Sequence, residues 1–237
     1  MRHLPNLITL GNLFCGCLAI TSIFNAKLEQ AGVFILLALL LDFLDGFAAR
    51  ALKANSALGK QLDSLADMVS FGVVPGMMLY TIFFMGSASS EMNPQLLSAG
   101  QHAMFLVTLF SCLRLARFNI DTRQSNHFIG LPTPANTLMI MSFPFILGHD
   151  EFGLSPLIYN PLFLLALSLF CSWLLIAEIP LLALKFRSFR WKDNRGQYTL
   201  LAFSALLLLF FRYAAPPLII LFYVILSLIF PPEKISK

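Results

Sequence analysis

Charged residues are scarce in this chain. Asp, Glu, Lys and Arg make up 12% of its 237 residues, whereas soluble domains have about 25%, and 58% of the residues are hydrophobic. The sequence also lacks a polar or charge-rich tract long enough to form a disordered tail. This balance argues against an ordinary soluble fold and against a disordered chain. It predicts an all-α integral membrane protein.

Cysteine and histidine are also few, with four of each. The four cysteines lie in apolar segments, and no second polar ligand stands at the spacing of a zinc site. We therefore expect no disulfide framework and no zinc site, and we interpret all four as small buried hydrophobic residues. They are Cys15, Cys17, Cys112 and Cys171.

The excess of positive charge is small, at +4. Its largest basic cluster, Lys185 to Arg195, lies between apolar segments, where membrane proteins keep their cytoplasmic positive charge. We therefore expect no nucleic acid partner, and the charge indicates a lipid surface instead. The apolar stretch near the N-terminus is interrupted by Asn6, Asn12 and Gly16 and lacks a small-residue cleavage site, so it predicts a retained first helix.

Long apolar runs divide the chain into membrane-crossing lengths. At about 20 apolar residues per crossing, the pattern predicts a polytopic bundle of eight helices. A turn at Ala214 to Pro217 is needed to separate the last two helices. The predicted spans are 5–24, 31–52, 62–85, 98–118, 132–148, 156–184, 198–212 and 214–231.

Basic residues follow an inside–outside pattern along these spans. If the N-terminus is cytoplasmic, every Lys and Arg except Lys27 and Arg212 falls in or beside an inner loop, and acidic residues mark the outer loops. This arrangement obeys the positive-inside rule. We expect a protein of the bacterial cytoplasmic membrane, with both termini and the active site in the cytosol. The inner group comprises Arg2, Arg50, Lys53, Lys60, Arg114, Arg117, Arg123, the Lys185 to Arg195 cluster, Lys234 and Lys237.

Four of the twelve acidic residues stand in or beside the second and third predicted spans: Asp42, Asp45, Asp63 and Asp67. Each ionised carboxylate at a helix centre costs roughly 2.5–3.5 kcal/mol if it is unpaired. The members of the two pairs are about 60° and about 40° apart around their helices, so each pair points to one side. A short 50–60 segment makes the helices antiparallel, and the four carboxylates then converge near the cytosolic surface.

Two explanations account for such a cluster. Two divalent cations would cancel its charge, and hard oxygen ligands without His or Cys favour Mg²⁺ or Mn²⁺. Two such ions suit transfer at a phosphorus centre. Alternatively, the aspartates form a salt-bridge network with Arg50, Lys53 and Lys60 at the helix ends.

The spacing of these residues matches a known signature. The pattern Asp42-x2-Asp45-Gly46-x2-Ala49-Arg50-x8-Gly59-x3-Asp63-x3-Asp67 resembles that of the CDP-alcohol phosphatidyltransferases. Further segments between residues 5 and 135 resemble the membrane-embedded phosphatidylserine synthases of that family. These segments are Pro5-Asn6 with Thr9 and Asn12, Ser70-Phe71-Gly72, Leu113 to Asn119, and Gly130 to Ala135.

The resemblance implies an organisation for the whole chain. Residues 1–237 would form a single transmembrane domain, with a catalytic six-helix core over 1–184 that contains the motif at 42–67. Residues 185–237 would then add a basic cytoplasmic loop and two further helices. The resemblance also implies a homodimer.

Roles for individual residues follow from the same resemblance. The four aspartates would hold two divalent cations, Mg²⁺ or Mn²⁺, and Asp67 would also be the general base. Arg114 and Arg117 stand near the inner end of the fourth span, where they either bind the carboxylate of serine or snorkel to anchor the helix. Contacts to CDP-diacylglycerol are implied for Asn6, Gly46, Arg50, Ser56 and Gly59, although Ser and Asn at helix ends are often only caps.

The implied reaction transfers a phosphatidyl group from CDP-diacylglycerol to L-serine and yields phosphatidylserine and CMP. An alternative keeps the donor and uses glycerol 3-phosphate or an inositol phosphate, which would need a denser basic pocket than Arg114, Arg117 and Arg123 provide. A remote alternative is a divalent-cation transporter, because carboxylates within a membrane also line ion paths.

Overall fold

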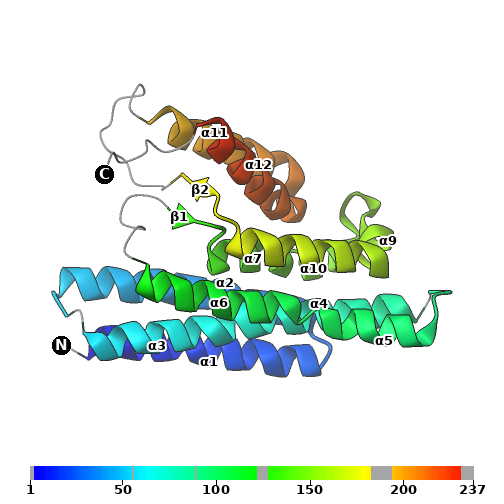
Figure 1. Cartoon of the computed structure of the whole chain (residues 1–237), viewed down its shortest axis with the longest axis horizontal. Helices are drawn as coiled ribbons and strands as arrows, with labels where there is room; N and C mark the ends of the chain where they lie inside the picture. The colour runs from blue at the N-terminus through cyan, green and yellow to red at the C-terminus, as the bar shows by residue number, and fades with distance from the viewer. Residues whose placement is uncertain (1–2, 55, 89, 122–127, 183–193, 231–237) are drawn as a thin grey trace.

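The computed structural model describes residues 3–54, 56–88, 90–121, 128–182 and 194–230, and this part of the chain is almost entirely helical (Figure 1). Two short strands, β1 (Phe128–Ile129) and β2 (Pro180–Leu181), pair antiparallel. The α-helices are α1 (Leu4–Phe24), α2 (Leu28–Ala51), α3 (Ala57–Asp67), α4 (Val74–Ser87), α5 (Pro94–Ala103), α6 (Leu106–Ile120), α7 (Thr133–Met141), α8 (Phe143–His149), α9 (Ser155–Ile158), α10 (Pro161–Ile176), α11 (Arg195–Phe211) and α12 (Ala215–Ile229). A π-helix, η1 (Met68–Val73), joins α3 to α4, and the 3₁₀ turns are η2 (Glu151–Gly153) and η4 (Arg212–Ala214).

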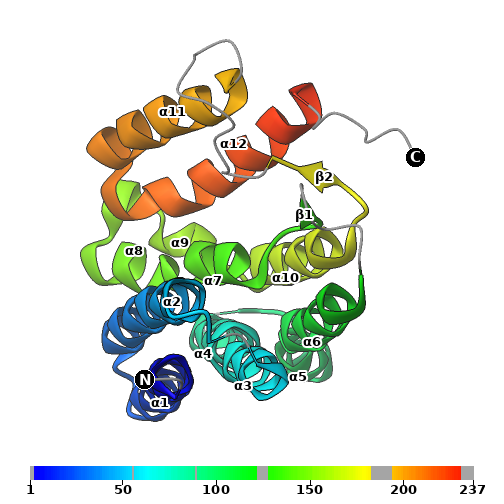
Figure 2. The ribbon, with the colours of Figure 1, turned by 90° about the vertical axis from the view of Figure 1, so that its left-hand side faces the viewer.

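The helices form three layers, which are clearest in the end-on view of Figure 2. Helices α1 to α6 make the first layer and α7 to α10 the second. The hairpin of α11 and α12 lies on the far side of the second layer from α1. Its contacts with the rest of the bundle are made mainly to α7, β2 and α8.

Five helical stretches in the described residues are long and apolar enough to cross a membrane: Leu4–Phe24, Leu28–Ala51, Ala57–Ser87, Pro94–Ile120 and Arg195–Ile229. The prediction of an all-α integral membrane protein is thereby confirmed. The count of eight spans stays a prediction. The predicted fifth span is divided into two short helices, α7 and α8, and α10, in the predicted sixth span, has only 16 residues.

One predicted boundary near the C-terminus is wrong, and the last predicted turn is present but begins two residues earlier than expected. Helix α10 ends at Ile176 rather than at residue 184, because Pro180 disfavours helical backbone in the residue before it and the segment pairs with β1 instead. The last turn lies at Arg212–Ala214, where Arg212 leaves the helical conformation with φ 36° and ψ −109°. Pro216 and Pro217 then fall in the first turn of α12, where proline is tolerated. The predicted core boundary at residue 184 lies outside the described residues.

Charges of opposite sign gather at opposite ends of the bundle. The end of α2, the start of α3 and the end of α6 lie together at the left of Figure 1, and they carry Arg50, Lys60 and Arg117. The other end carries Glu29 at the start of α2 and Glu151 in η2, together with Lys27 and Arg212, the two basic residues that the pattern places outside. This separation agrees with the predicted inside–outside pattern. Arg2, Arg123, residues 185–193, Lys234 and Lys237 lie outside the described part of the chain.

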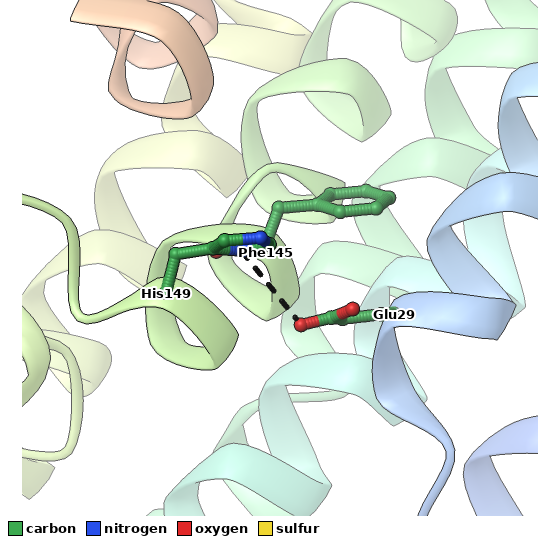
Figure 3. A network of polar contacts seen from close by, with 3 residues as sticks. All are labelled: Glu29, Phe145 and His149. Carbon is green, nitrogen blue, oxygen red and sulfur yellow. Dashed lines mark hydrogen bonds and ion pairs between the residues drawn. The ribbon is translucent and has the colours of Figure 1, made fainter.

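A cluster of polar and aromatic side chains joins the layers at the acidic end (Figure 3). His149 Nδ1 lies 3.0 Å from the carbonyl oxygen of Phe145 and 3.9 Å from Glu29 Oε1. The ring of Tyr213 stacks on Phe145 with centroids 5.5 Å apart, and a carboxylate oxygen of Glu151 accepts a hydrogen bond from the backbone of η4. These contacts tie the turn between α11 and α12 to α2 and α8.

The interpretation of all four cysteines as buried is wrong for two of them. Cys17 and Cys112 are exposed and Cys15 is half-buried, whereas Cys171 is buried. Outward-facing positions of a membrane protein are as apolar as its interior, so an apolar neighbourhood in the sequence does not show that a residue is buried. Phe24, 77% exposed, follows the same rule. All four cysteines are free thiols in this structure.

Candidate active site

Three of the four predicted carboxylates form one cluster. Asp42 of α2 and Asp63 and Asp67 of α3 each offer an oxygen, and these oxygens lie within 4.8 Å of one another. Asp67 is buried, at 8% exposure. Asp45, one helical turn beyond Asp42, is also buried but does not belong to this trio. The structure therefore confirms that α2 and α3 bring carboxylates together.

The described basic side chains form no ion pair with the cluster. Among the described residues, no Lys or Arg nitrogen lies within 4.0 Å of Asp42, Asp45, Asp63 or Asp67. The salt-bridge network considered as an alternative is therefore not formed by these residues. Like charges held this close in a poorly solvated site need a counter-charge, and three hard oxygen donors without His or Cys fit a divalent cation such as Mg²⁺ or Mn²⁺.

Helix α1 supplies two polar side chains that hold the aspartates. Thr9 Oγ1 donates a hydrogen bond to Asp45 Oδ2, and Asn12 Nδ2 donates to Asp67 Oδ1 at 3.2 Å. Asn12 is fully buried, and its carbonyl oxygen in the backbone accepts a bond of 3.1 Å from Ser70 Oγ. The bond from Asn12 therefore fixes the carboxylate of Asp67 beside those of Asp42 and Asp63. Sequence reasoning assigned no role to Thr9 or Asn12, although two polar residues three apart in an apolar helix are a usable signal.

The π-helix η1 begins directly after Asp67 and connects the cluster to α6 and α7. In an α-helix the carbonyl of Phe71 would accept a hydrogen bond from the N–H of residue 75, but Pro75 has no N–H. The carbonyl of Phe71 instead accepts a bond of 3.0 Å from Thr137 Oγ1. The carbonyl of Gly72 accepts a bond of 2.9 Å from Thr108 Oγ1. Single π-turns inside helices are frequent at functional sites. Here the π-turn lets two neighbouring helices fix the segment that follows Asp67.

The first cavity has a volume of about 550 Å³ and lies between α1, α2 and α3. Asp45 and Asp63 stand in its wall, and all five residues that the resemblance associates with the donor line it. Ser56 caps α3 as well, because its Oγ accepts a bond of 3.0 Å from Gly59 N. The lining comprises Pro5, Asn6, Thr9, Asp45, Gly46, Ala49, Arg50, Ala54, Ser56, Ala57, Gly59, Lys60 and Asp63.

Lys60 is a second cation in the first cavity that sequence reasoning did not assign to the site. Its Nζ donates a hydrogen bond of 2.9 Å to the carbonyl oxygen of Asn119, near the end of α6. The side-chain amide of Asn119 donates in turn to Ser64 Oγ at 2.7 Å. Lys60 therefore stands both in the cavity wall and at the contact between α3 and α6.

The second cavity has a volume of about 470 Å³ and lies on the side of α6 and α7. It contains the three clustered aspartates and shares Gly46, Arg50 and Asp63 with the first cavity. Its lining comprises Asp42, Phe43, Gly46, Arg50, Asp63, Ser64, Asp67, Arg114, Leu115, Phe118, Pro132, Thr133 and Pro134.

The structure separates the two arginines that were predicted together. Arg114 lines the second cavity and is 5% exposed, with its guanidinium carbon 5.1 Å from the centroid of the Phe118 ring. Its Nε has no hydrogen-bond partner among the described residues. Arg117, three residues further along α6, is exposed and does not line the cavity. Arg114 is thus a buried cation with unused donor capacity, 5% exposed, beside a group of carboxylates.

The aspartates lie between two cavities, and each cavity contains basic residues. In a helical membrane protein this arrangement indicates chemistry on phosphate groups at a membrane. The family model described as CDP-alcohol phosphatidyltransferase matches residues 2–184, and the chain belongs to this family.

Within this family, the chain is similar to enzymes that are named for serine as a substrate or product component. The chain is 38% identical over 170 residues to a CDP-diacylglycerol–serine O-phosphatidyltransferase of Bacillus subtilis, a match that covers 68% of this chain and 88% of the relative. An enzyme of the same name from Helicobacter pylori is 35% identical over 62% of each chain. The archaetidylserine synthase of Methanothermobacter thermautotrophicus is 36% identical over 59% of this chain and 57% of its own length. The resemblance to phosphatidylserine synthases is thereby confirmed.

The bond from Asn12 to Asp67 predicts a change in metal affinity. Replacing Asn12 with Leu removes the donor that fixes Asp67, and we expect Mn²⁺ to bind roughly 10–100-fold more weakly. Electron paramagnetic resonance titration of the purified protein in detergent measures the affinity. Asn25→Leu, at the exposed end of the same helix, is the matched control. Equal affinities in the Asn12 variant and in the unmodified protein would contradict this role.

Proposed function

We propose that the protein transfers the phosphatidyl group of CDP-diacylglycerol to L-serine and releases phosphatidylserine and CMP. One observation carries the proposal: clustered aspartates lie where two cavities meet, and each cavity has a basic residue of its own. The names of the relatives support serine as the acceptor. The first cavity would take the nucleotide of the donor and the second the acceptor.

The donor is anionic, and the first cavity offers two cations to it. The guanidinium fork of Arg50 suits the diphosphate, and Lys60 adds a point charge on the opposite wall, from α3. Gly59 keeps that wall open, because a Cβ there would lie 3.2 Å from Asn6 Oδ1 and 3.1 Å from Ser56 Oγ. Gly46 likewise presents bare backbone to the nucleotide. The proposed donor contacts are Asn6, Gly46, Arg50, Ser56, Gly59 and Lys60.

The carboxylates would hold divalent cations. Asp42, Asp63 and Asp67 supply one group of oxygens, and Asp45 extends it toward the first cavity, so the set fits two ions of Mg²⁺ or Mn²⁺. Bound there, such ions polarise the phosphate oxygens and stabilise the charge that develops on them. The protein contributes the fixed positions of the ligands, which Thr9 and Asn12 secure from α1.

Asp67 is the proposed general base. Its Oδ1 is held by Asn12, and the carboxylate would take the proton from the serine hydroxyl. The serine oxygen then forms a bond to the phosphorus that bears the diacylglycerol group, and the bond from that phosphorus to the oxygen of CMP breaks. CMP departs with the electron pair, and the proton stays on Asp67 until solvent removes it.

Arg114 is the proposed partner of the serine carboxylate. It is the buried cation of the second cavity, and a carboxylate is a bidentate partner for a guanidinium group. Glycerol 3-phosphate or an inositol phosphate carries more negative charge than serine. Within the described lining of this cavity the basic residues are Arg50 and Arg114, which are few for such an acceptor, and we assign Arg50 to the donor.

We also propose the orientation that the charges indicate. The protein would lie in a bacterial cytoplasmic membrane, with the end that carries Arg50, Lys60 and Arg117 facing the cytosol. Serine would enter from the cytosol and CMP would leave to it. Residues 1–184 would form the catalytic core. The chain termini would lie on the same side as the aspartates.

Replacing the base tests the reaction. The purified protein in detergent with Mg²⁺ or Mn²⁺ should release CMP from CDP-diacylglycerol with L-serine, and Asp67→Asn should lower the rate by about 100-fold or more. Release with glycerol 3-phosphate or inositol phosphate instead of serine would contradict the proposed acceptor. If no alcohol yields CMP while vesicles that contain the protein take up divalent cations, the chain is a transporter and the proposal is overturned.

The two arginines of α6 should behave differently. Arg114→Ala should raise the KM for serine by roughly tenfold or more, because a buried charge-assisted pair is lost, and should leave the KM for CDP-diacylglycerol nearly unchanged. Arg117→Ala is the matched control and should keep both constants. Steady-state CMP release with each substrate varied in turn measures them. A larger serine effect in the Arg117 variant would assign the carboxylate to the exposed residue.

Lys60 should contribute to donor binding. Lys60→Met removes the ammonium and keeps most of the side-chain volume, so we expect the KM for CDP-diacylglycerol to rise roughly three- to tenfold, as for a partly exposed charge pair. Lys53→Met, an exposed lysine outside the first cavity, should have no such effect. An unchanged donor KM in the Lys60 variant would restrict this lysine to its contact with Asn119.

A further inference from the structure

Helix α12 contacts β2, and β2 pairs with the chain segment that leads to the second cavity. That segment begins with β1, whose Phe128 and Ile129 stand opposite Leu181 and Pro180 of β2. Beyond the strand, Gly130 N donates a bond of 3.0 Å to the carbonyl of Ile179. The strand pair therefore joins the chain before α7 to the chain after α10.

Helix α12 holds the end of β2 by both backbone groups of one residue. Tyr223 Oη donates a hydrogen bond of 2.8 Å to the carbonyl of Leu182, and Leu182 N donates a bond of 3.1 Å to Ser227 Oγ. Ser227 Oγ in turn donates to the carbonyl of Tyr223 at 2.7 Å. All three residues are buried. Leu182 directly follows β2, so α12 fixes the position of that strand.

The chain that leads to the wall of the second cavity is bonded both to the segment before the held strand and to the end of α10. Leu131 N donates a bond of 2.9 Å to the carbonyl of Leu174, and Gly130 adopts φ 75°. A Cβ at Gly130 would lie 2.8 Å from the carbonyl oxygen of Leu175, so the backbone passes close to the end of α10. The next residues, Pro132 to Pro134, line the second cavity together with the aspartates.

We infer that the α11–α12 hairpin positions the acceptor side of the active site, with Tyr223 and Ser227 as its positioning residues. The route runs from α12 through Leu182, β2 and β1 to the Pro132 to Pro134 wall, and each step is a hydrogen bond or a covalent link. The hairpin lies beyond residues 2–184, which the family model matches. This inference rests on the proposed function, because it assigns the second cavity to the acceptor.

Among the described residues, the hairpin has no such hydrogen-bonded route to the donor side, because its contacts reach α2 only near Glu29, at the opposite end of that helix from Gly46 and Arg50. The described lining of the first cavity comes from residues 5–63, in α1, α2, α3 and the turn between α2 and α3. Loosening α12 should therefore weaken acceptor binding and leave donor binding unchanged. A hairpin that only stabilised the fold would affect both substrates alike, or neither.

The experiment compares two double variants of the full-length protein. Tyr223→Phe with Ser227→Ala removes the side-chain bonds to Leu182, and Tyr213→Phe with Ser204→Ala makes the same chemical changes elsewhere in α11 and η4. For the first variant we expect the KM for serine to rise roughly three- to tenfold, as for the loss of one or two hydrogen bonds, and the KM for CDP-diacylglycerol to stay within about twofold. The control should keep both constants.

A second readout does not depend on the acceptor. Hydrogen–deuterium exchange should be faster at the amides of Gly130 and Leu131 in the first double variant than in the control, because the strand that orders them is no longer held. If the double variant does not fold, Tyr223→Phe alone is measured in the same two ways, with Tyr213→Phe as its control.

Three outcomes would overturn the inference: an unchanged serine KM, equal changes for donor and acceptor, or unchanged exchange at Gly130 and Leu131. A wild-type protein that does not use serine contradicts the proposed function instead. The comparison of acceptor KM is then made with the alcohol that does release CMP, and an unchanged KM for that alcohol overturns the inference as well.

Discussion

The cost of holding three carboxylates together inside a membrane protein governs this structure. Asp42, Asp63 and Asp67 lie within a few ångströms of one another, and no described basic side chain pairs with them. Removing charges from water without a counter-ion costs several kcal/mol per ion, and the proposed divalent cations would supply that counter-charge. Helix α1 provides the amide and hydroxyl donors, and η1 fixes the chain that follows Asp67.

The same constraint accounts for the placement of the cations. Arg50, Lys60 and Arg114 stand in the cavity walls rather than against the carboxylates. A basic residue bonded directly to the aspartates would neutralise them and compete with a metal ion. A basic residue that lines the same cavity without an ion pair to the aspartates leaves them free and would still attract the proposed anionic substrate.

Much of the site could be predicted because it depends on local spacing. The aspartates are three and four residues apart, and this spacing places each pair on one side of its helix whatever the rest of the chain does. Apart from Asn6 of α1, the proposed donor contacts also lie close together in the sequence, around the segment formed by α2, a turn and α3. Asp45 was predicted to join the cluster but does not belong to the trio, and it accepts a hydrogen bond from Thr9 of α1 instead. The spacing of residues within α2 carries no information about this contact with another helix.

The features that the sequence did not predict depend on contacts between distant segments. Lys60 meets Asn119 and Tyr223 meets Leu182, and in each pair more than 40 residues separate the partners. Hydropathy also fails to distinguish the interior of the bundle from its lipid-facing surface, which is why Cys17 and Cys112 were assigned wrongly. The end of α10 was missed because the residues after it remain apolar while they leave the helix to pair with β1.

The arrangement of the two cavities has a consequence for stereochemistry. They approach Asp63 from different sides, one from α1 and the other from α6 and α7. A phosphorus atom held between them would have the departing nucleotide on one side and the attacking hydroxyl on the other. A single displacement with that geometry inverts the configuration at phosphorus. A donor with a chiral thiophosphate would therefore give a product of inverted configuration.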